Sequence, residues 1–174
     1  MAKKYYTVTV TPSITDEADG SDDSTAFGNG DVLFAGTEVK LPADGCKLIN
    51  AQAIWNDTQA ASEEMLLFFF QNNTHALGTV NAAASITAAQ IATNVFLGAK
   101  RLVNVSTGEA DLGTPSLLTS NAVNDNSAAN ANQSPIVLKS GATKGIVYVQ
   151  GLLEVTGGIT CAADSLKIVL HFEV

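Results

Sequence analysis

Residues 166–174 read LKIVLHFEV. Every second side chain in this stretch is large and apolar, and a period of two is typical of a β-strand that buries one face. The alternation continues to Val174. We therefore expect this strand to lie inside a sheet, because the ends of a chain fray unless pairing ties them down.

The same period recurs at the other end of the chain. Residues 5–11 read YYTVTVT, which places Tyr6, Val8 and Val10 on one face. Pro12 ends this strand because proline has no N–H to give to a neighbour. Comparable patterns predict further strands at 31–41, 46–56, 64–71, 100–105, 135–139 and 144–155.

Turn residues favour two hairpins among these strands. Asp44 and Gly45 follow the strand at 31–41, and residues 140–143 follow the strand at 135–139. The inward faces are predicted from the alternation: Ile49, Ala51, Ala53 and Trp55 on one strand, and Val147, Val149, Leu153 and Val155 on another. Trp55 is therefore expected in the core, where it cannot serve as a sugar-binding platform.

One stretch departs from the strand pattern. Residues 81–92 are rich in alanine, and Ser85 or Thr87 could cap a short helix there. Met65 to Phe70 is a continuous apolar run, predicted to be a strand buried on both faces or covered by a partner. About eight strands and one short helix predict an all-β fold, an antiparallel β-sandwich or jelly roll, because the βαβ rhythm is missing.

The domain organisation follows from length and polarity. The chain has 174 residues, enough for one globular domain. We expect residues 1–30 to form an N-terminal strand or arm with an acidic loop, and residues 31–174 to form the sandwich. Residues 106–134 are polar and predicted to be a long loop. No apolar run approaches the ~20 residues that cross a membrane.

Composition excludes several classes of partner. The net charge is −8 and the chain has nine lysines and arginines, so nucleic-acid binding is not expected. Only two histidines are present, His75 and His171, and neither a nucleophile elbow nor a phosphate loop occurs. We therefore predict no enzymatic activity and no cofactor. Cys46 and Cys161 are interpreted as two buried thiols, with a disulfide as the alternative.

Two segments could contact other molecules. Asp16, Asp19, Asp22 and Asp23 offer hard oxygen ligands for a cation, but their spacing is not that of an EF-hand. A charged loop that aids solubility or meets a basic partner is the favoured interpretation. Lys3, Lys4, Tyr5 and Tyr6 open the first strand; they form either a plain edge strand or an arm that adds to a neighbour's sheet.

Several stretches follow one another in a characteristic order: Val39–Leu41, Leu48–Asp57, Leu67–Phe70, Asn72–Thr74, Ser85–Ala92, Phe96–Gly98, Ile146–Leu153 and the terminal strand. This order resembles a known family, the head decoration or cement proteins of tailed phages. The resemblance covers residues 31–174 and departs at the acidic Asp16–Asp23 segment and the polar loop.

The resemblance implies a structural virion protein on the outer surface of the phage head. Such a protein, often a trimer, would bind the major capsid protein where capsomers meet and clamp neighbouring subunits. A carbohydrate-binding or host-attachment module of a phage fibre is the alternative function. It would require exposed aromatic residues or a cation site near the loops.

Overall fold

The computed structural model describes residues 3–14, 26–55, 64–104, 116–120, 135–154 and 165–174. Over these residues the chain forms nine strands and one short helix. In order they are β1 (Tyr5–Val10), β2 (Val32–Lys40), β3 (Gly45–Trp55), β4 (Glu64–Phe70), α1 (Ala88–Asn94), β5 (Phe96–Asn104), β6 (Ser116–Thr119), β7 (Ile136–Lys139), β8 (Ile146–Glu154) and β9 (Leu166–Glu173).

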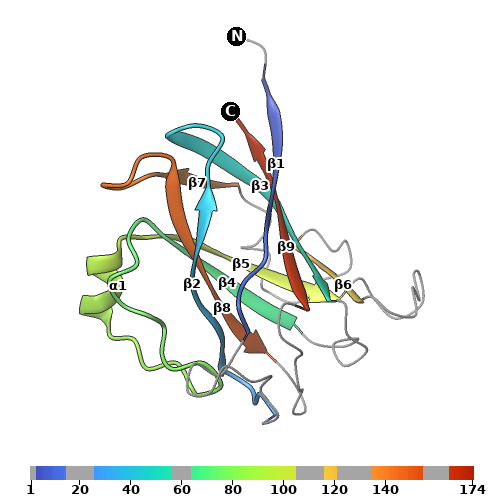
Figure 1. Cartoon of the computed structure of the whole chain (residues 1–174), viewed down its shortest axis with the longest axis vertical. Coiled ribbons are helices and arrows are strands. Elements are labelled where there is room, and N and C mark those ends of the chain that lie inside the picture. Colours follow the sequence, from blue (N-terminus) through green and yellow to red (C-terminus); the bar gives the residue numbers. More distant parts are fainter. Residues whose placement is uncertain (1–2, 15–25, 56–63, 105–115, 121–134, 155–164) are drawn as a thin grey trace.

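The strands pair in a nested order, from the two ends of the chain toward its middle. β1 pairs with β9, β2 with β8, β3 with β6 and β4 with β5, all antiparallel. This nested ribbon rolls up so that β9 also pairs with β3 and β8 with β4. The result is two facing sheets, β1-β9-β3-β6 and β2-β8-β4-β5, joined where β5 meets β6 (Figure 1). This is a jelly roll, which confirms the predicted fold class.

One strand was not predicted, and another has a different partner from the predicted one. β6 lies within the segment predicted to be a loop and pairs with the second half of β3. β7 pairs with the first half of β3, along the same edge. Both predicted hairpins are wrong. β2 pairs with β8 and not with β3, and β7 pairs with β3 and not with β8. Turn residues reverse the chain, but in a jelly roll the next strand joins the opposite sheet.

The core lies between the two sheets. Trp55 is 1% exposed, as predicted for a core residue. β9 lies between β1 and β3, and its apolar side chains at every second position are buried, as predicted; Val174, which follows β9, is 44% exposed. The buried apolar residues of β9 are Leu166, Ile168, Leu170 and Phe172, and those predicted for β8 are Val147, Val149 and Leu153; Val155 lies outside the described residues.

A bulge in β3 overturns one prediction about this core. The pairing of β3 with β9 shifts register between Leu48 and Asn50, so Ile49 is the extra residue. Leu48 and Ala51 are both buried, three positions apart, and Ile49 is only partly buried. A bulge places two residues opposite one, so the alternation changes phase at this point.

The outer face of the second sheet has a covering of its own. α1 begins at Thr87, whose side chain accepts the N–H of Gln90 while Gln90 caps in return, so Thr87 rather than Ser85 is the N-cap. Leu77, Ile86 and Ile91 pack with Phe70 in a second apolar cluster outside the sheet. β4 is therefore enclosed on both faces at its end, as its continuous apolar run predicts.

A glycine in the centre of β8 makes room for a ring of the neighbouring strand β2. Gly151 pairs with Phe34, and a Cβ placed there would lie 2.2 Å from the Phe34 ring. We expect Gly151→Ala to lower the free energy of unfolding by about 1–3 kcal/mol, because the ring must leave its rotamer. Urea denaturation followed by tryptophan fluorescence measures this.

Gly45→Ala is the matched control. The nearest atom to a Cβ at Gly45 lies 4.0 Å away, so an alanine fits there without displacement. We expect its stability to stay within about 0.5 kcal/mol of the parent protein. Equal losses in both variants would contradict the close packing of Gly151 on Phe34.

Candidate functional site

The ring of His171 contacts side chains of two neighbouring strands. The Nδ1 atom of His171 lies 3.2 Å from Oγ1 of Thr7, and its Nε2 atom lies 3.5 Å from Oε1 of Gln52. These contacts hold the ring between β1 and β3. Across the described residues no group of three His, Cys, Asp or Glu side chains could hold a metal ion. In the same ranges no helix is long and apolar enough to cross a membrane.

Several predicted site residues lie outside the described residues. They include the acidic candidates Asp16, Asp19, Asp22 and Asp23, and also Cys161. The prediction for the acidic segment therefore stays a prediction. Cys46 is within the described part of the chain, where its thiol is free and 5% exposed. Burial raises the pKa of Cys46 to about 11, so the thiol is protonated and unreactive at neutral pH.

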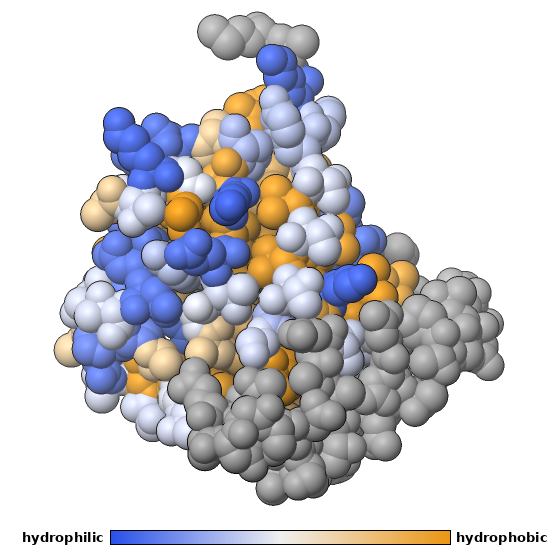
Figure 2. Space-filling view, viewed as in Figure 1, coloured by the Kyte–Doolittle hydropathy of each residue, from blue (hydrophilic) through white to orange (hydrophobic). Residues whose placement is uncertain are grey.

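The N-terminal strand lies at the end of the first sheet. Within the part of the chain that the structure describes, β1 pairs with β9 alone, and β2 at the end of the other sheet comes close to β1 without pairing with it. Tyr5 is 64% exposed and Tyr6 41% exposed. Figure 2 shows apolar atoms between polar ones on the face where Figure 1 places β1 and β2. The plain edge strand is thus observed, and its use as an arm is still a prediction.

The direction of the backbone groups of β1 follows from its register. Lys4 and Val174 exchange both N–H···O bonds, at 3.1 Å and 2.9 Å. In an antiparallel pair such bonded positions alternate with non-bonded ones. The N–H and C=O groups of Tyr5, Thr7 and Thr9 consequently point away from β9. Among the described residues no strand pairs with this open edge.

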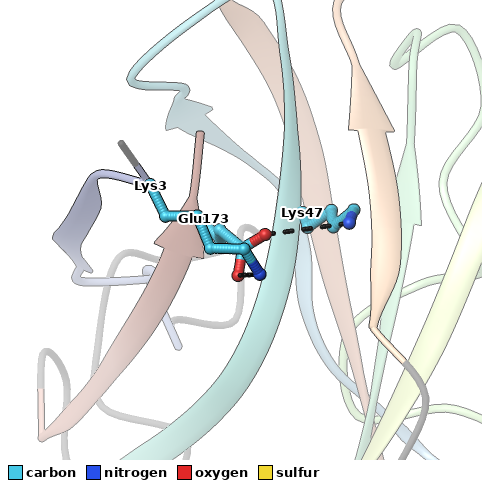
Figure 3. Close-up of polar contacts among 3 residues, drawn as sticks. All are labelled: Lys3, Lys47 and Glu173. Carbon is cyan, nitrogen blue, oxygen red and sulfur yellow. Dashed lines mark hydrogen bonds and ion pairs between the residues drawn. The ribbon is translucent and has the colours of Figure 1, made fainter. Parts of the chain in front are cut away.

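An ion-pair group fixes the beginning of this strand. Nζ of Lys3 lies 3.0 Å from Oε2 of Glu173, and Nζ of Lys47 lies 3.7 Å from Oε1 of the same carboxylate (Figure 3). The three residues belong to the start of the chain, β9 and β3. The hydrogen bond and the charge of Lys3 lower the pKa of Glu173, and Glu173 raises the pKa of Lys3.

Buried amides that the sequence did not indicate hold the segment between β4 and α1. Gln150 on β8 accepts the N–H of Leu77 at 2.7 Å and donates to the carbonyl of His75 at 3.2 Å. Asn94, at the end of α1, accepts the N–H groups of Thr74 and His75. Gln150 and Asn94 are both fully buried. An amide in an apolar strand is the sequence signal that could have revealed this network.

Comparisons with known proteins identify no family. No family model matches the chain, and no curated protein matches it. The structure is weakly similar to a chain of Desmodium yellow mottle tymovirus, with 13% identity over 99% of this chain and 86% of that chain and a TM-score of 0.32. It is also weakly similar to a chain of infectious bursal disease virus strain Gx, with 12% identity over 98% of this chain and 41% of that chain and a TM-score of 0.19.

The buried thiol gives a labelling prediction. In a Cys161→Ser variant Cys46 is the only thiol, and we expect it to react with a thiol reagent in the native state far more slowly than in urea. The reason is that the reactive thiolate is suppressed by burial, which raises the pKa of Cys46 to about 11. Rapid stoichiometric labelling of the native variant would contradict its place in the core.

The ion-pair group gives a pH prediction. Because the pKa of Glu173 is lowered in the folded state, its stabilisation is present above the pKa of the unfolded residue and is lost as the pH falls through the lower folded value. The raised pKa of Lys3 sets the opposite limit, since that contribution is lost as the pH rises through it. The hydrogen-exchange protection of the Tyr6 and Val8 amides, whose N–H groups point toward β9, should therefore fall at acid pH.

Glu173→Gln is the control for this measurement. It removes the titrating carboxylate, so we expect the acid-dependent step in the protection of Tyr6 and Val8 to disappear. An unchanged step in Glu173→Gln would mean that another group controls the pairing of β1. High salt should also weaken the step in the parent protein, because Lys3 is 66% exposed and exposed pairs are screened.

Proposed function

We propose that the chain is a structural virion protein that binds the outside of a phage capsid and clamps neighbouring capsid subunits. In this proposal it acts as a homo-oligomer, a trimer, and its partner is the major capsid protein. The observation that carries the proposal is the open edge of β1. This edge offers the backbone groups of Tyr5, Thr7 and Thr9 to a strand of another protein.

The side chains around this edge suit contact with a protein surface. Tyr5 and Tyr6 are exposed, and tyrosine is enriched at interfaces because it joins an apolar ring to a polar hydroxyl. Lys3 and Lys4 precede them in a chain of net charge −8. Lys3, Lys4, Tyr5 and Tyr6 therefore form the proposed contact, at the start of the N-terminal region of residues 1–30, whose strand β1 is part of the first sheet.

A clamp needs rigidity more than chemistry. The jelly roll supplies two sheets with a shared core, and this fold is found in viral capsid proteins but also in lectin domains, so the fold alone does not decide the function. The burial of Trp55 removes the one tryptophan as a sugar platform. Several weak contacts, each from one copy of an oligomer, would combine by avidity into firm attachment.

The acidic segment has a secondary place in this proposal. We propose Asp16, Asp19, Asp22 and Asp23 as a charged loop that faces basic residues of the capsid, with no bound metal. Sedimentation with capsids in the presence and absence of a chelator tests this part. Capsid binding that requires calcium would replace the charged loop with a cation site.

Thr7→Pro tests the strand-addition edge. Proline removes the N–H of residue 7, which points away from β9, so the bonds between β1 and β9 are kept. We expect a small change in stability and at least a tenfold loss of affinity for capsids, on the order of the 1.4 kcal/mol that a factor of ten represents. Co-sedimentation with capsids that lack their outer proteins measures this.

Thr7→Val is the matched control because it also removes the hydroxyl that contacts His171 but keeps the N–H. We expect it to bind capsids like the parent protein. If Thr7→Pro binds as well as Thr7→Val, the edge of β1 is not the contact. If the unaltered protein does not sediment with capsids, the virion role itself is wrong.

A further inference from the structure

A second surface of the molecule is unusual in its lack of charge. From Met65 to Ala99 the sequence contains no Asp, Glu, Lys or Arg, although 15% of the chain is charged. The structure describes this entire stretch, which forms β4, α1 and the start of β5. The next charged residue, Lys100, is fully buried and so adds no charge to this surface.

Two adjacent apolar residues are exposed here. Val95 is 40% exposed and Phe96 45% exposed. Their neighbours Phe68 and Ile91 are partly buried hydrophobic residues. We refer to these four residues, Phe68, Ile91, Val95 and Phe96, as the apolar face. Interface cores are depleted in charge and enriched in aromatic residues, which this face matches.

The backbone at Val95 is in a conformation that valine disfavours. Val95 caps the C-terminal end of α1 with φ 56°, in the left-handed region. Glycine or asparagine usually fills this position, and a β-branched side chain there is a rare outlier. Asn81, the other described non-glycine residue with positive φ, follows the rule. In this conformation the Val95 side chain lies at the surface, next in sequence to the exposed Phe96.

The apolar face is held in place before any partner arrives. The ring of Phe96 lies 6.2 Å from that of Phe68 and 5.7 Å from that of Phe70, measured between centroids. Asn94, directly before Val95, is buried and bonded to the segment that follows β4. Because these groups are already ordered, binding at this face costs little conformational entropy.

Charge identifies the occupant. Each copy of the chain carries a net charge of −8, and like charges brought together oppose association. The apolar face lies in a charge-free stretch, so two copies can meet there without opposing carboxylates.

We infer that the apolar face is the surface through which copies of this chain contact one another. This inference rests on the homo-oligomer of the proposed function and names the surface that forms it. It is distinct from the open edge of β1, which belongs to the other sheet and is proposed for the capsid. A capsid subunit is the competing occupant, and the experiment separates the two.

Val95→Asn tests the apolar face. Asparagine tolerates the left-handed conformation, so this variant keeps the cap and relieves strain, and its thermal midpoint should equal or exceed that of the parent. Its self-association should nevertheless weaken at least about tenfold. Ala88→Glu is a second variant: it places an acid in the first turn of α1, where the helix favours it, three residues before Ile91 on the same side of the helix, and so sets like charges against each other between copies.

Sedimentation equilibrium of the purified full chain, without capsids, gives the association constants. Val137→Asn is the matched control, because Val137 is a 64% exposed valine on β7 in the other sheet, and we expect it to associate like the parent. A parent protein that is monomeric throughout overturns the inference, as does association unchanged in both Val95→Asn and Ala88→Glu. Capsid co-sedimentation of the same samples is measured separately. If a variant loses capsid binding but keeps its self-association, the capsid is the occupant of the apolar face, and the inference is overturned in that case as well.

Discussion

The pairing of β9 between β1 and β3 is the constraint on which the rest of the structure depends. It joins the two ends of the chain, so every other strand must pair inside the loop that they close. With β1 fixed to β9, β2 meets β8, β3 meets β6 and β4 meets β5, and the ribbon can bury its apolar face only by rolling up. The ion pairs of Glu173 with Lys3 and Lys47 lie across the same three strands.

The sequence predicted which residues form strands better than it predicted which strands pair. Alternation depends on neighbours along the chain, and it placed β9 and most of β8 correctly because their predicted faces lie in the core, whereas on β1 only Val10 of the predicted face is buried. Partners in a jelly roll are far apart in sequence, so the turn at Asp44 and Gly45 gave a false hairpin. The bulge at Ile49 is equally invisible, because it depends on the register with β9.

The candidate contact surfaces depended still more on the fold. Tyr5 and Tyr6 could be selected from the sequence as an exposed pair, but the parity of the pairing with β9 decides which backbone groups face outward. The charge-free stretch around α1 is visible in the sequence. A stretch of this composition could equally be a buried element. The exposure of Val95 and Phe96 in the structure is what makes it a candidate contact surface.

The two surfaces differ in what they can recognise. A strand edge binds through backbone groups that every protein has, so specificity at β1 must come from Tyr5, Tyr6 and the lysines beside them. The proposed contact at the apolar face depends on the shape of its side chains. That shape includes Val95, which caps α1 in the left-handed conformation. Oligomers formed through the face would present several β1 edges at fixed spacing, because each domain is rigid. Such an oligomer would bind with avidity only to a target whose binding sites repeat at the same spacing. In this way a strand edge with little specificity of its own would become selective for an ordered lattice.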